Sequence, residues 1–248
     1  MSKNFELLKL VEKYDFFNLF KLPAEPATLP QKAHAAISLK KVSPDTEIAK
    51  LVQRLFSPAG NGSGPRVVSF SGISRDERSS WICARAGEIL AEQADTSVCL
   101  VDANFWSPQL HVHLATANQI GLAEALATEG PIRNFGKPLC GENPWLIPSG
   151  LVKRGLYPSI ERYRERLAEL RESFDYILLS APALSRETEA TFLGQLADGI
   201  VLIVEANHSR RETVRRAKEQ LESAHVRLLG AVLDQRTFPI PEGLYRRL

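Results

Sequence analysis

Apolar residues along the chain gather in short continuous runs, and the stretches between these runs have helical periodicity. The runs predict six strands, at 66–71, 97–103, 144–148, 174–180, 199–206 and 226–234. Most runs are continuous rather than alternating, which is typical of strands buried on both faces of a parallel sheet. The helices expected between them span 77–93, 119–128, 158–173, 186–197 and 209–224. This alternation predicts an α/β fold with a doubly wound, mostly parallel sheet, and such sheets bind ligands beyond the carboxyl ends of their strands.

The first 42 residues are predicted to form a separate N-terminal region. Residues 1–20 place Phe5, Leu8 and Val11 at helical spacing, which predicts a short amphipathic helix. This helix would either dock on the domain or contact a partner or a membrane surface. Residues 21–42 contain three prolines among Ala, Lys and Thr, and therefore predict a semi-extended linker.

Residues 43–248 are predicted to form the folded domain. Ser43 and Pro44 supply an N-cap and a proline at the first helical position, so a helix is expected to begin there. The Gly- and Pro-containing segment 57–65 predicts a hinge before the first core strand, and residues 235–248 are interpreted as a C-terminal tail.

Composition limits the functions that the chain can have. A length of 248 residues suits one sizeable α/β domain with extensions, and a net charge of +2 gives no reason to expect nucleic-acid binding. The cysteines Cys83, Cys99 and Cys140 are odd in number and lack metal-ligand spacing, which favours reduced, buried thiols. No signal peptide opens the chain and no apolar run approaches the ~18 residues of a spanning helix. We therefore expect a cytoplasmic protein that reaches a membrane only through a partner.

The segment 66–86 has the layout of a phosphate-binding loop. A buried strand is followed by a loop that opens at Gly72 and by a helix from about Glu77, and backbone N–H groups at such a junction can cradle phosphate. A P-loop reads G-x-x-x-x-G-K-[ST], whereas this loop reads GISRDERS: Gly72 and Ser79 match, but Glu77 and Arg78 replace Gly and Lys. The residues placed to hold a nucleotide are Gly72, Ser74, Glu77, Arg78, Ser79 and Ser80.

Two further strand ends carry candidate chemistry. Asp102 could hold Mg²⁺ or orient a hydroxyl nucleophile, or it could cap the local backbone. Ser180 ends the strand 174–180, where a neutral hydroxyl binds hydrated Mg²⁺ weakly and cannot act as a base. No other metal site is indicated, because His111 and His113 lack nearby Cys or Asp partners.

An ordered series of motifs follows the loop. LVDAN at 100–104 with PQLH at 108–111 is followed by FDYILLSAP at 174–182 and by Thr188-Glu189-Ala190. The series resembles the bacterial tyrosine kinase (BY-kinase) family of capsule and exopolysaccharide biosynthesis, which belongs to the wider MinD/ParA-like group of P-loop proteins. The resemblance covers about residues 43–234. It implies a P-loop NTPase-like fold, ATP and Mg²⁺ as ligands, and phosphorylation of tyrosines in the tail. The residues that the resemblance puts at the Mg²⁺ positions are Ser79, Asp102, Asn104 and Ser180.

The departures from the family pattern bear on activity. The family's kinases use the P-loop Gly and Lys, two acids in the second motif and an acid in the third, whereas this chain has Glu77, Arg78, Asn104 and Ser180 at those positions, with Asn104 in place of the second acid. Asp102 and Arg78 are the remaining candidates for catalytic roles. The family's tyrosine cluster is reduced to Tyr245, which is either a phosphoacceptor or a packing residue beside two arginines.

Glu77 is the most damaging replacement. It adds a Cβ and a negative charge where phosphate would approach, and two like charges 4 Å apart repel by about 4 kcal/mol at an effective dielectric of 20. Ser74 and Glu77 also form an S-x-x-E capping box, in which the loop's own side chains satisfy the N–H groups that would hold phosphate. The sequence therefore predicts a nucleotide site closed by its own side chains.

Three functions follow from these observations. The leading hypothesis is a catalytically impaired BY-kinase-like subunit that regulates or scaffolds a membrane chain-length determinant (polysaccharide co-polymerase) protein at the inner membrane. The second is an active ATP-dependent tyrosine autokinase that phosphorylates Tyr245. The third is a MinD/ParA-like ATPase. Family members also self-associate through E-x-x-R-x-x-R, which Glu47, Lys50 and Arg54 match in part, so the resemblance implies a homo-oligomer.

Overall fold

A computed structural model of the chain describes residues 19–23, 44–56, 64–74, 77–92, 96–139, 141–151, 159–185, 188–206 and 208–236. The strands are β1 (Leu19–Pro23), β2 (Val67–Gly72), β3 (Val98–Asp102), β4 (Lys137–Pro138), β5 (Trp145–Ile147), β6 (Tyr176–Ser180), β7 (Gly199–Glu205) and β8 (Leu228–Arg236). The helices are α2 (Pro44–Phe56), α3 (Glu77–Ala91), α4 (Leu110–His113), α5 (Leu122–Ala127), the 3-10 helix η1 (Ile132–Phe135), α6 (Ile160–Ser173), α7 (Thr188–Leu196) and α8 (Arg211–Ser223).

The strands form one sheet in the order β1-β8-β7-β2-β6-β3-β5-β4. Every neighbouring pair is parallel except β4 and β5. The prediction of a doubly wound, mostly parallel α/β sheet is confirmed, and the six predicted strands and the helices between them differ from the structure only at their ends. Strand order jumps between β7, β2 and β6, as crossover connections through helices require.

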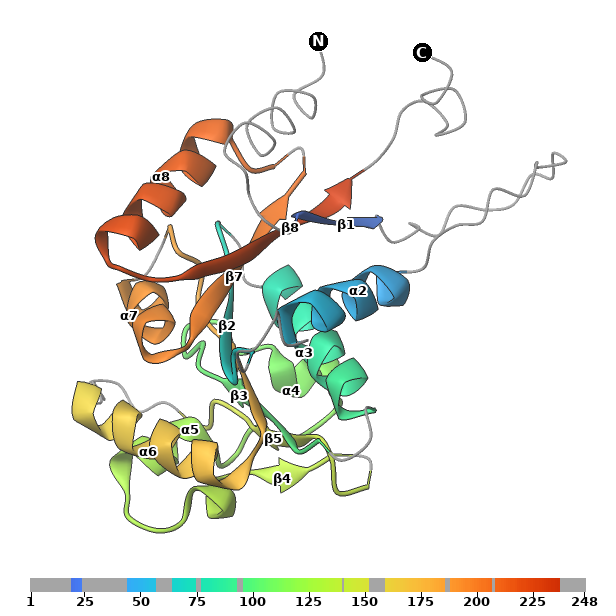
Figure 1. Cartoon of the computed structure of the whole chain (residues 1–248). Coiled ribbons are helices and arrows are strands. Elements are labelled where there is room, and N and C mark those ends of the chain that lie inside the picture. The colour runs from blue at the N-terminus through green and yellow to red at the C-terminus, as the bar shows by residue number, and fades with distance from the viewer. Residues whose placement is uncertain are drawn as a thin grey trace, which may run out of the picture.

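Helices cover both faces of the sheet (Figure 1). Val68 and Phe70 of β2 pack in one apolar cluster with residues of α2 and α3, such as Leu51 and Ile82. Val67, one position away, packs in another cluster with residues of α6 and α7. Successive strand residues point to opposite faces, so a strand covered on both sides is apolar throughout. This explains the continuous runs in the sequence.

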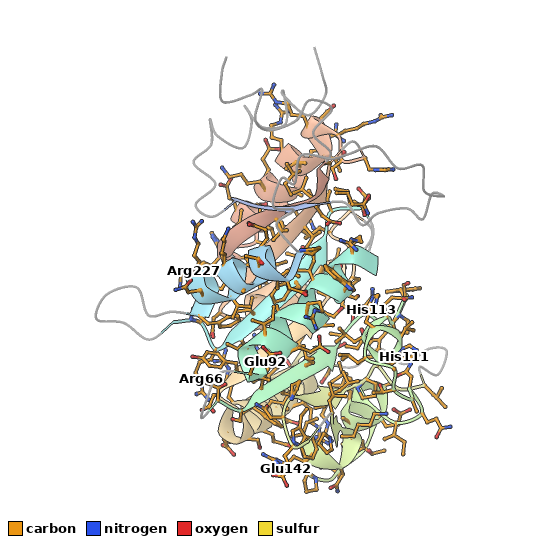
Figure 2. All side chains as sticks on the ribbon, turned by 90° about the vertical axis from the view of Figure 1, so that its right-hand side faces the viewer. Arg66, Glu92, His111, His113, Glu142 and Arg227 are labelled. Carbon is orange, nitrogen blue, oxygen red and sulfur yellow. The ribbon has the colours of Figure 1, made fainter. Side chains whose placement is uncertain are left out.

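All the long strands run in the same direction, so their two ends differ in character. Figure 2 shows Arg66 and Arg227, which precede β2 and β8, on one side of the molecule. His111 and His113, which follow β3, lie on the opposite side. The second side is the carboxyl edge of the sheet, where ligands of doubly wound folds bind.

The N-terminal prediction is wrong at residues 19–23. The structure has strand β1 there, parallel to β8, in place of the end of a helix and the start of a linker. Residues 1–18 and 24–43 lie outside the described residues. Strand β8 also continues to Arg236, so the first two residues assigned to the C-terminal tail belong to the sheet.

Two close contacts fix the carboxyl end of β5. The Gly121 and Leu151 N–H groups donate to the two carboxylate oxygens of Glu124 in α5, at 2.8 and 3.0 Å. Gly150 has φ +78°, and a Cβ added there would lie 2.0 Å from the Glu124 Oε2 atom. Glycine is therefore required at position 150 by both backbone conformation and space.

Arg166 of α6 is a buried charge with a structural role. Only 2% of the residue is exposed. Its guanidinium group donates to the carbonyl oxygens of Ala125, Thr128 and Gly130, at 2.6–2.8 Å, and to the Glu169 carboxylate at 2.7 Å. The carbonyls at the end of α5 are thereby satisfied by a cation, which suits the negative end of the helix dipole.

Within the described ranges, no helix combines the length and the apolar character needed to cross a membrane.

Candidate functional site

The residues that the sequence singles out meet at the carboxyl edge of three adjacent strands. In the strand register, Ser180 at the end of β6 lies opposite Phe70 of β2 and opposite Asp102 at the end of β3. Ser79 and Ser80 come from the first turn of α3, which follows β2. The side chains of Ser79, Ser80, Asp102, Asn104 and Ser180 are buried, with no exposed surface. The fold therefore brings the predicted site residues together, but away from solvent.

The end of β6 is closed by hydroxyl groups. The Ser80 and Ser180 hydroxyl oxygens lie 2.9 Å apart in a hydrogen bond. The Ser71 hydroxyl donates to the Pro182 carbonyl at 2.6 Å. Ser185 N–H donates to the Ile73 carbonyl at 3.0 Å, so the segment after β6 is tied to the loop after β2. These bonds are neutral and internal, and none of them supplies a charge for a metal.

Asp102 serves the local backbone. Its carboxylate accepts from the N–H groups of Gln109 and Leu110, at 3.1 and 3.0 Å, and from Asn104 N–H at 3.3 Å. The acid therefore holds the loop after β3 and the start of α4, which matches the capping alternative weighed from the sequence. To coordinate Mg²⁺ the carboxylate would have to give up such donors.

Asn104 organises the same loop. Its side-chain oxygen accepts from Trp106 N–H at 3.2 Å and from Ser107 N–H at 3.1 Å. Its buried Nδ2 atom has no hydrogen-bond partner in the described part of the chain. The loop leaves Trp106 66% exposed at the surface.

Arg78, at the position of the P-loop lysine, is engaged elsewhere. Its Nε and Nη2 atoms donate to the two carboxylate oxygens of Asp234, at 2.6 and 2.8 Å, in a bidentate ion pair. The Asp234 side chain is fully buried and that of Arg78 is 17% exposed. The guanidinium carbon also lies 4.5 Å from the centre of the Trp81 ring. The Arg78 guanidinium group therefore points toward Asp234, near the carboxyl end of strand β8.

Sequence reasoning missed Asp234. The acid closes the predicted strand 226–234, and strand-end acids of a parallel sheet lie at the same edge as Asp102. That position is the signal that could have identified it. Its pairing with a residue 156 positions away follows only from the sheet order.

The structure describes only some of the other predicted site residues. The side chain of Glu77, residues 75 and 76, and Tyr245 lie outside the described residues, so the capping box and the phosphoacceptor remain predictions. Gly72 ends β2, and Ser74 is exposed in the following loop. The Lys50 ammonium group lies 2.7 Å from the Glu47 carboxylate on α2.

The described cysteines are buried and unpaired. Cys83 and Cys99 form no disulfide. Burial raises the pKa of the Cys83 thiol well above its usual value, and the nearby Asp102 charge adds to the effect. Burial also raises the pKa of Cys99. Both thiols therefore stay protonated and unreactive near neutral pH.

The described residues do not fit a Mg²⁺–nucleotide site in this arrangement. The cation at the lysine position is neutralised by Asp234, the third-motif position is a serine bonded to another serine, and Asp102 is occupied by backbone donors. Within the described ranges no group of three or more His, Cys, Asp or Glu side chains is arranged to hold a metal ion.

Comparison with known proteins finds relatives that are named tyrosine-protein kinases. No family model matches it. It is 24% identical over 160 residues to tyrosine-protein kinase YwqD of Bacillus subtilis, covering 64% of this chain and 67% of YwqD. It is 24% identical over 181 residues to tyrosine-protein kinase CpsD of Streptococcus agalactiae, covering 71% of this chain and 77% of CpsD. The chain is similar to these tyrosine-protein kinases along most of its predicted P-loop domain. The resemblance inferred from the motifs is confirmed.

A third relative is much longer. The succinoglycan biosynthesis transport protein ExoP of Rhizobium meliloti is 26% identical over 179 residues, covering 70% of this chain but only 23% of ExoP. The match therefore concerns one part of that protein.

Solved structures show the same fold. The chimerical protein CapA2B2 aligns with a TM-score of 0.77 at 16% identity, over 93% of this chain and 99% of that one. The kinase domain of the Escherichia coli tyrosine kinase ETK aligns with a TM-score of 0.74 at 18% identity, over 93% and 96%. The MinC:MinD complex of Aquifex aeolicus gives 0.59 at 23% identity, over 73% and 72%.

Proposed function

We propose that this protein is a catalytically impaired BY-kinase-like subunit of capsule or exopolysaccharide biosynthesis, and that it regulates or scaffolds a membrane chain-length determinant protein. The observation that carries this proposal is the bidentate ion pair between Arg78 and the buried Asp234. The comparisons are equally consistent with an active kinase, and the geometry of the site is the observation that favours impairment.

The ion pair opposes nucleotide binding energetically. Arg78 must leave Asp234 before it can contact a phosphate, which strands a fully buried carboxylate. Breaking a buried pair in this way costs about 3–5 kcal/mol. That cost would weaken ATP binding by roughly two to four orders of magnitude, since 1.4 kcal/mol corresponds to a factor of ten.

The metal side of the reaction is weakened as well. Phosphoryl transfer relies on positioning and on neutralising charge, and the residues that would hold Mg²⁺ are Ser79, Asp102, Asn104 and Ser180. Of these only Asp102 is an acid, and its carboxylate accepts three backbone N–H groups. If ATP and Mg²⁺ bind at all, they bind weakly at this edge.

The relatives support the proposed partner and location. ExoP is named for succinoglycan biosynthesis transport, and its match with this chain covers less than a quarter of ExoP. This supports a chain that works beside a membrane polysaccharide co-polymerase, in the cytoplasm and peripheral to the inner membrane. The face of α2 that carries Glu47, Lys50 and Arg54 is the proposed site of self-association.

The alternative is an ATP-dependent tyrosine autokinase that uses Tyr245 as acceptor. It is supported by the names of YwqD and CpsD and by the retained Ser79 and Asp102. A MinD/ParA-like ATPase is less well supported, because the MinD complex has the lower TM-score, 0.59 against 0.77 for CapA2B2.

Titration with ATP and Mg²⁺ tests the proposal. Trp81 lies beneath Arg78, so its fluorescence reports any release of the ion pair, and a Trp106→Phe background removes signal from the exposed loop. A ligand at one hundred times its Kd stabilises a protein by about 2.7 kcal/mol, or roughly 5–10 °C for a domain of this size. We expect no such change at millimolar ATP. A saturable shift that is lost in Arg78→Ala would refute the proposal.

A further inference from the structure

A small pocket lies at the carboxyl edge beside the loop after β2. It is lined by Ile73 and Ser74 of that loop, by Ile203 and Glu205 of β7, and by His208 and Ser209 of the following turn, and its volume is about 120 Å³. A water molecule needs about 10–15 Å³ of such a volume, so the pocket has room for a group of several heavy atoms. Ser74 and His208 are exposed, so the pocket opens to solvent beside them.

The pocket wall contains a buried acid that no group in the described part of the chain neutralises. Glu205 is only 8% exposed, and no described side chain or N–H group forms a hydrogen bond or an ion pair with its carboxylate. The Glu205 N–H and carbonyl groups bond to Ser209, but these are backbone contacts of the turn. A buried carboxylate without a partner is unfavourable, and a ligand that supplies a charged donor removes that penalty.

A neighbouring acid, Asp234, is neutralised by a cation, whereas Glu205 is not in the described part of the chain. Glu205 lies opposite Asp234 in the β7–β8 register. By strand alternation both side chains face the same side of the sheet as Ile203 and Val232, the side covered by α3. Arg78 comes from that helix, but its guanidinium group is bound bidentately to Asp234. The Arg78 cation therefore neutralises Asp234, and no ion pair neutralises Glu205 among the described residues.

We propose that this pocket binds a cationic nitrogen group, a guanidinium or a primary ammonium, with the Glu205 carboxylate as its acceptor. An anion such as phosphate would meet a buried negative charge here, whereas a guanidinium can donate two hydrogen bonds to one carboxylate. The group comes either from a free small amine or from an Arg or Lys side chain of a protein partner. The inference does not depend on whether ATP binds at Arg78.

Calorimetric titration of the full chain with three probes tests the pocket. Agmatine represents a free small amine, N-acetyl-arginine amide represents a peptide side chain, and N-acetyl-citrulline amide is the neutral control. Binding of both cationic probes but not of citrulline supports a basic side chain as ligand, and binding of agmatine alone supports a free amine. Absence of binding by both cationic probes would overturn the proposal.

A matched pair of variants separates the pocket from general attraction of cations. Glu205→Gln keeps the shape of the side chain and removes its charge, so affinity should fall at least about tenfold, as expected when a charge-assisted hydrogen bond is lost. Glu219→Gln removes an exposed acid on α8 and should leave affinity unchanged. Equal losses in the two variants would contradict a specific site.

Thermal unfolding gives a second, independent readout. If Glu205 has no internal partner, Glu205→Gln should unfold at the same temperature as the unmodified protein or higher, because a buried unpaired charge is removed. A marked fall in melting temperature would mean that the carboxylate has a structural role, and this too would overturn the proposal.

Discussion

The ion pair between Arg78 and Asp234 can be tested by a double-mutant cycle. Arg78→Gln leaves Asp234 fully buried and without its cation, which should cost about 3–5 kcal/mol of unfolding free energy. Asp234→Asn leaves Arg78 partly exposed above Trp81, so its cost should be smaller, about 1.5–3 kcal/mol for the lost charged hydrogen bonds. The double variant loses the pair without stranding either charge.

The double variant should therefore be more stable than the sum of the two single effects predicts, by at least about 1.5 kcal/mol. The assay is urea denaturation followed by far-UV circular dichroism, because fluorescence would also respond to the change beside Trp81. In thermal unfolding, the loss in Arg78→Gln corresponds to roughly 6–20 °C for a domain of this size. Costs that add within about 0.5 kcal/mol would show that the two residues do not interact and would refute the reasoning.

The same cycle distinguishes the two functional hypotheses. If Arg78 serves a nucleotide rather than Asp234, Arg78→Gln should leave stability almost unchanged and remove any response to ATP. If Arg78 is a structural partner of Asp234, stability falls and the response to ATP is absent before and after the change.

Three further predictions concern the scaffold around the site. Burial raises the pKa of Asp198, but hydrogen bonds from Arg171 and from two N–H groups at the start of β2 outweigh this and hold the pKa below its ordinary value. Its stabilisation is therefore present above about pH 4 and is lost as the pH falls through the folded-state pKa, so Asp198→Asn should flatten the loss of urea resistance measured between pH 5 and 3. Gly150→Ala should cost at least about 1–3 kcal/mol by chemical denaturation, and more than Gly141→Ala, which has a similar positive φ but no atom within 4 Å of the added Cβ; equal costs would contradict the steric clash. Arg166→Met should cost about 2–3 kcal/mol in the same assay by stranding carbonyls at the end of α5, whereas the exposed Arg164→Met should stay within about 0.5 kcal/mol.

The core of the fold could be predicted from the sequence because a strand that is buried on both faces has a continuous run of apolar residues. A strand such as β7 is apolar at every position from Ile200 to Val204. The helices that flank the sheet carry apolar residues at helical spacing. This apolar pattern is local in the sequence, so it predicts the strands and helices without knowledge of tertiary contacts. That Asp102 and Ser180 lie side by side could be predicted in the same way, since the carboxyl ends of parallel strands meet at one edge of the sheet.

The missed features depend on contacts between distant segments. Strand β1 contains Lys21 and Pro23 and has little strand character of its own, and its place is set by pairing with the edge of β8. Helix α4 has four residues and begins where the Asp102 carboxylate accepts backbone N–H groups. A helix this short has too few residues to show a periodic apolar pattern. The Arg78–Asp234 pair joins residues that only the strand order brings together.

The central claim is that the site does not transfer phosphate, and the most direct test is transfer itself. The purified full chain is incubated with Mg²⁺ and ATP labelled at the γ-phosphate, and phosphate on Tyr245 is quantified by mass spectrometry over time, with Arg78→Ala as the comparison. An impaired site predicts no phosphate on Tyr245 above the level of the Arg78→Ala variant. Phosphate that accumulates on Tyr245 in the unmodified protein and disappears in Arg78→Ala would contradict the claim.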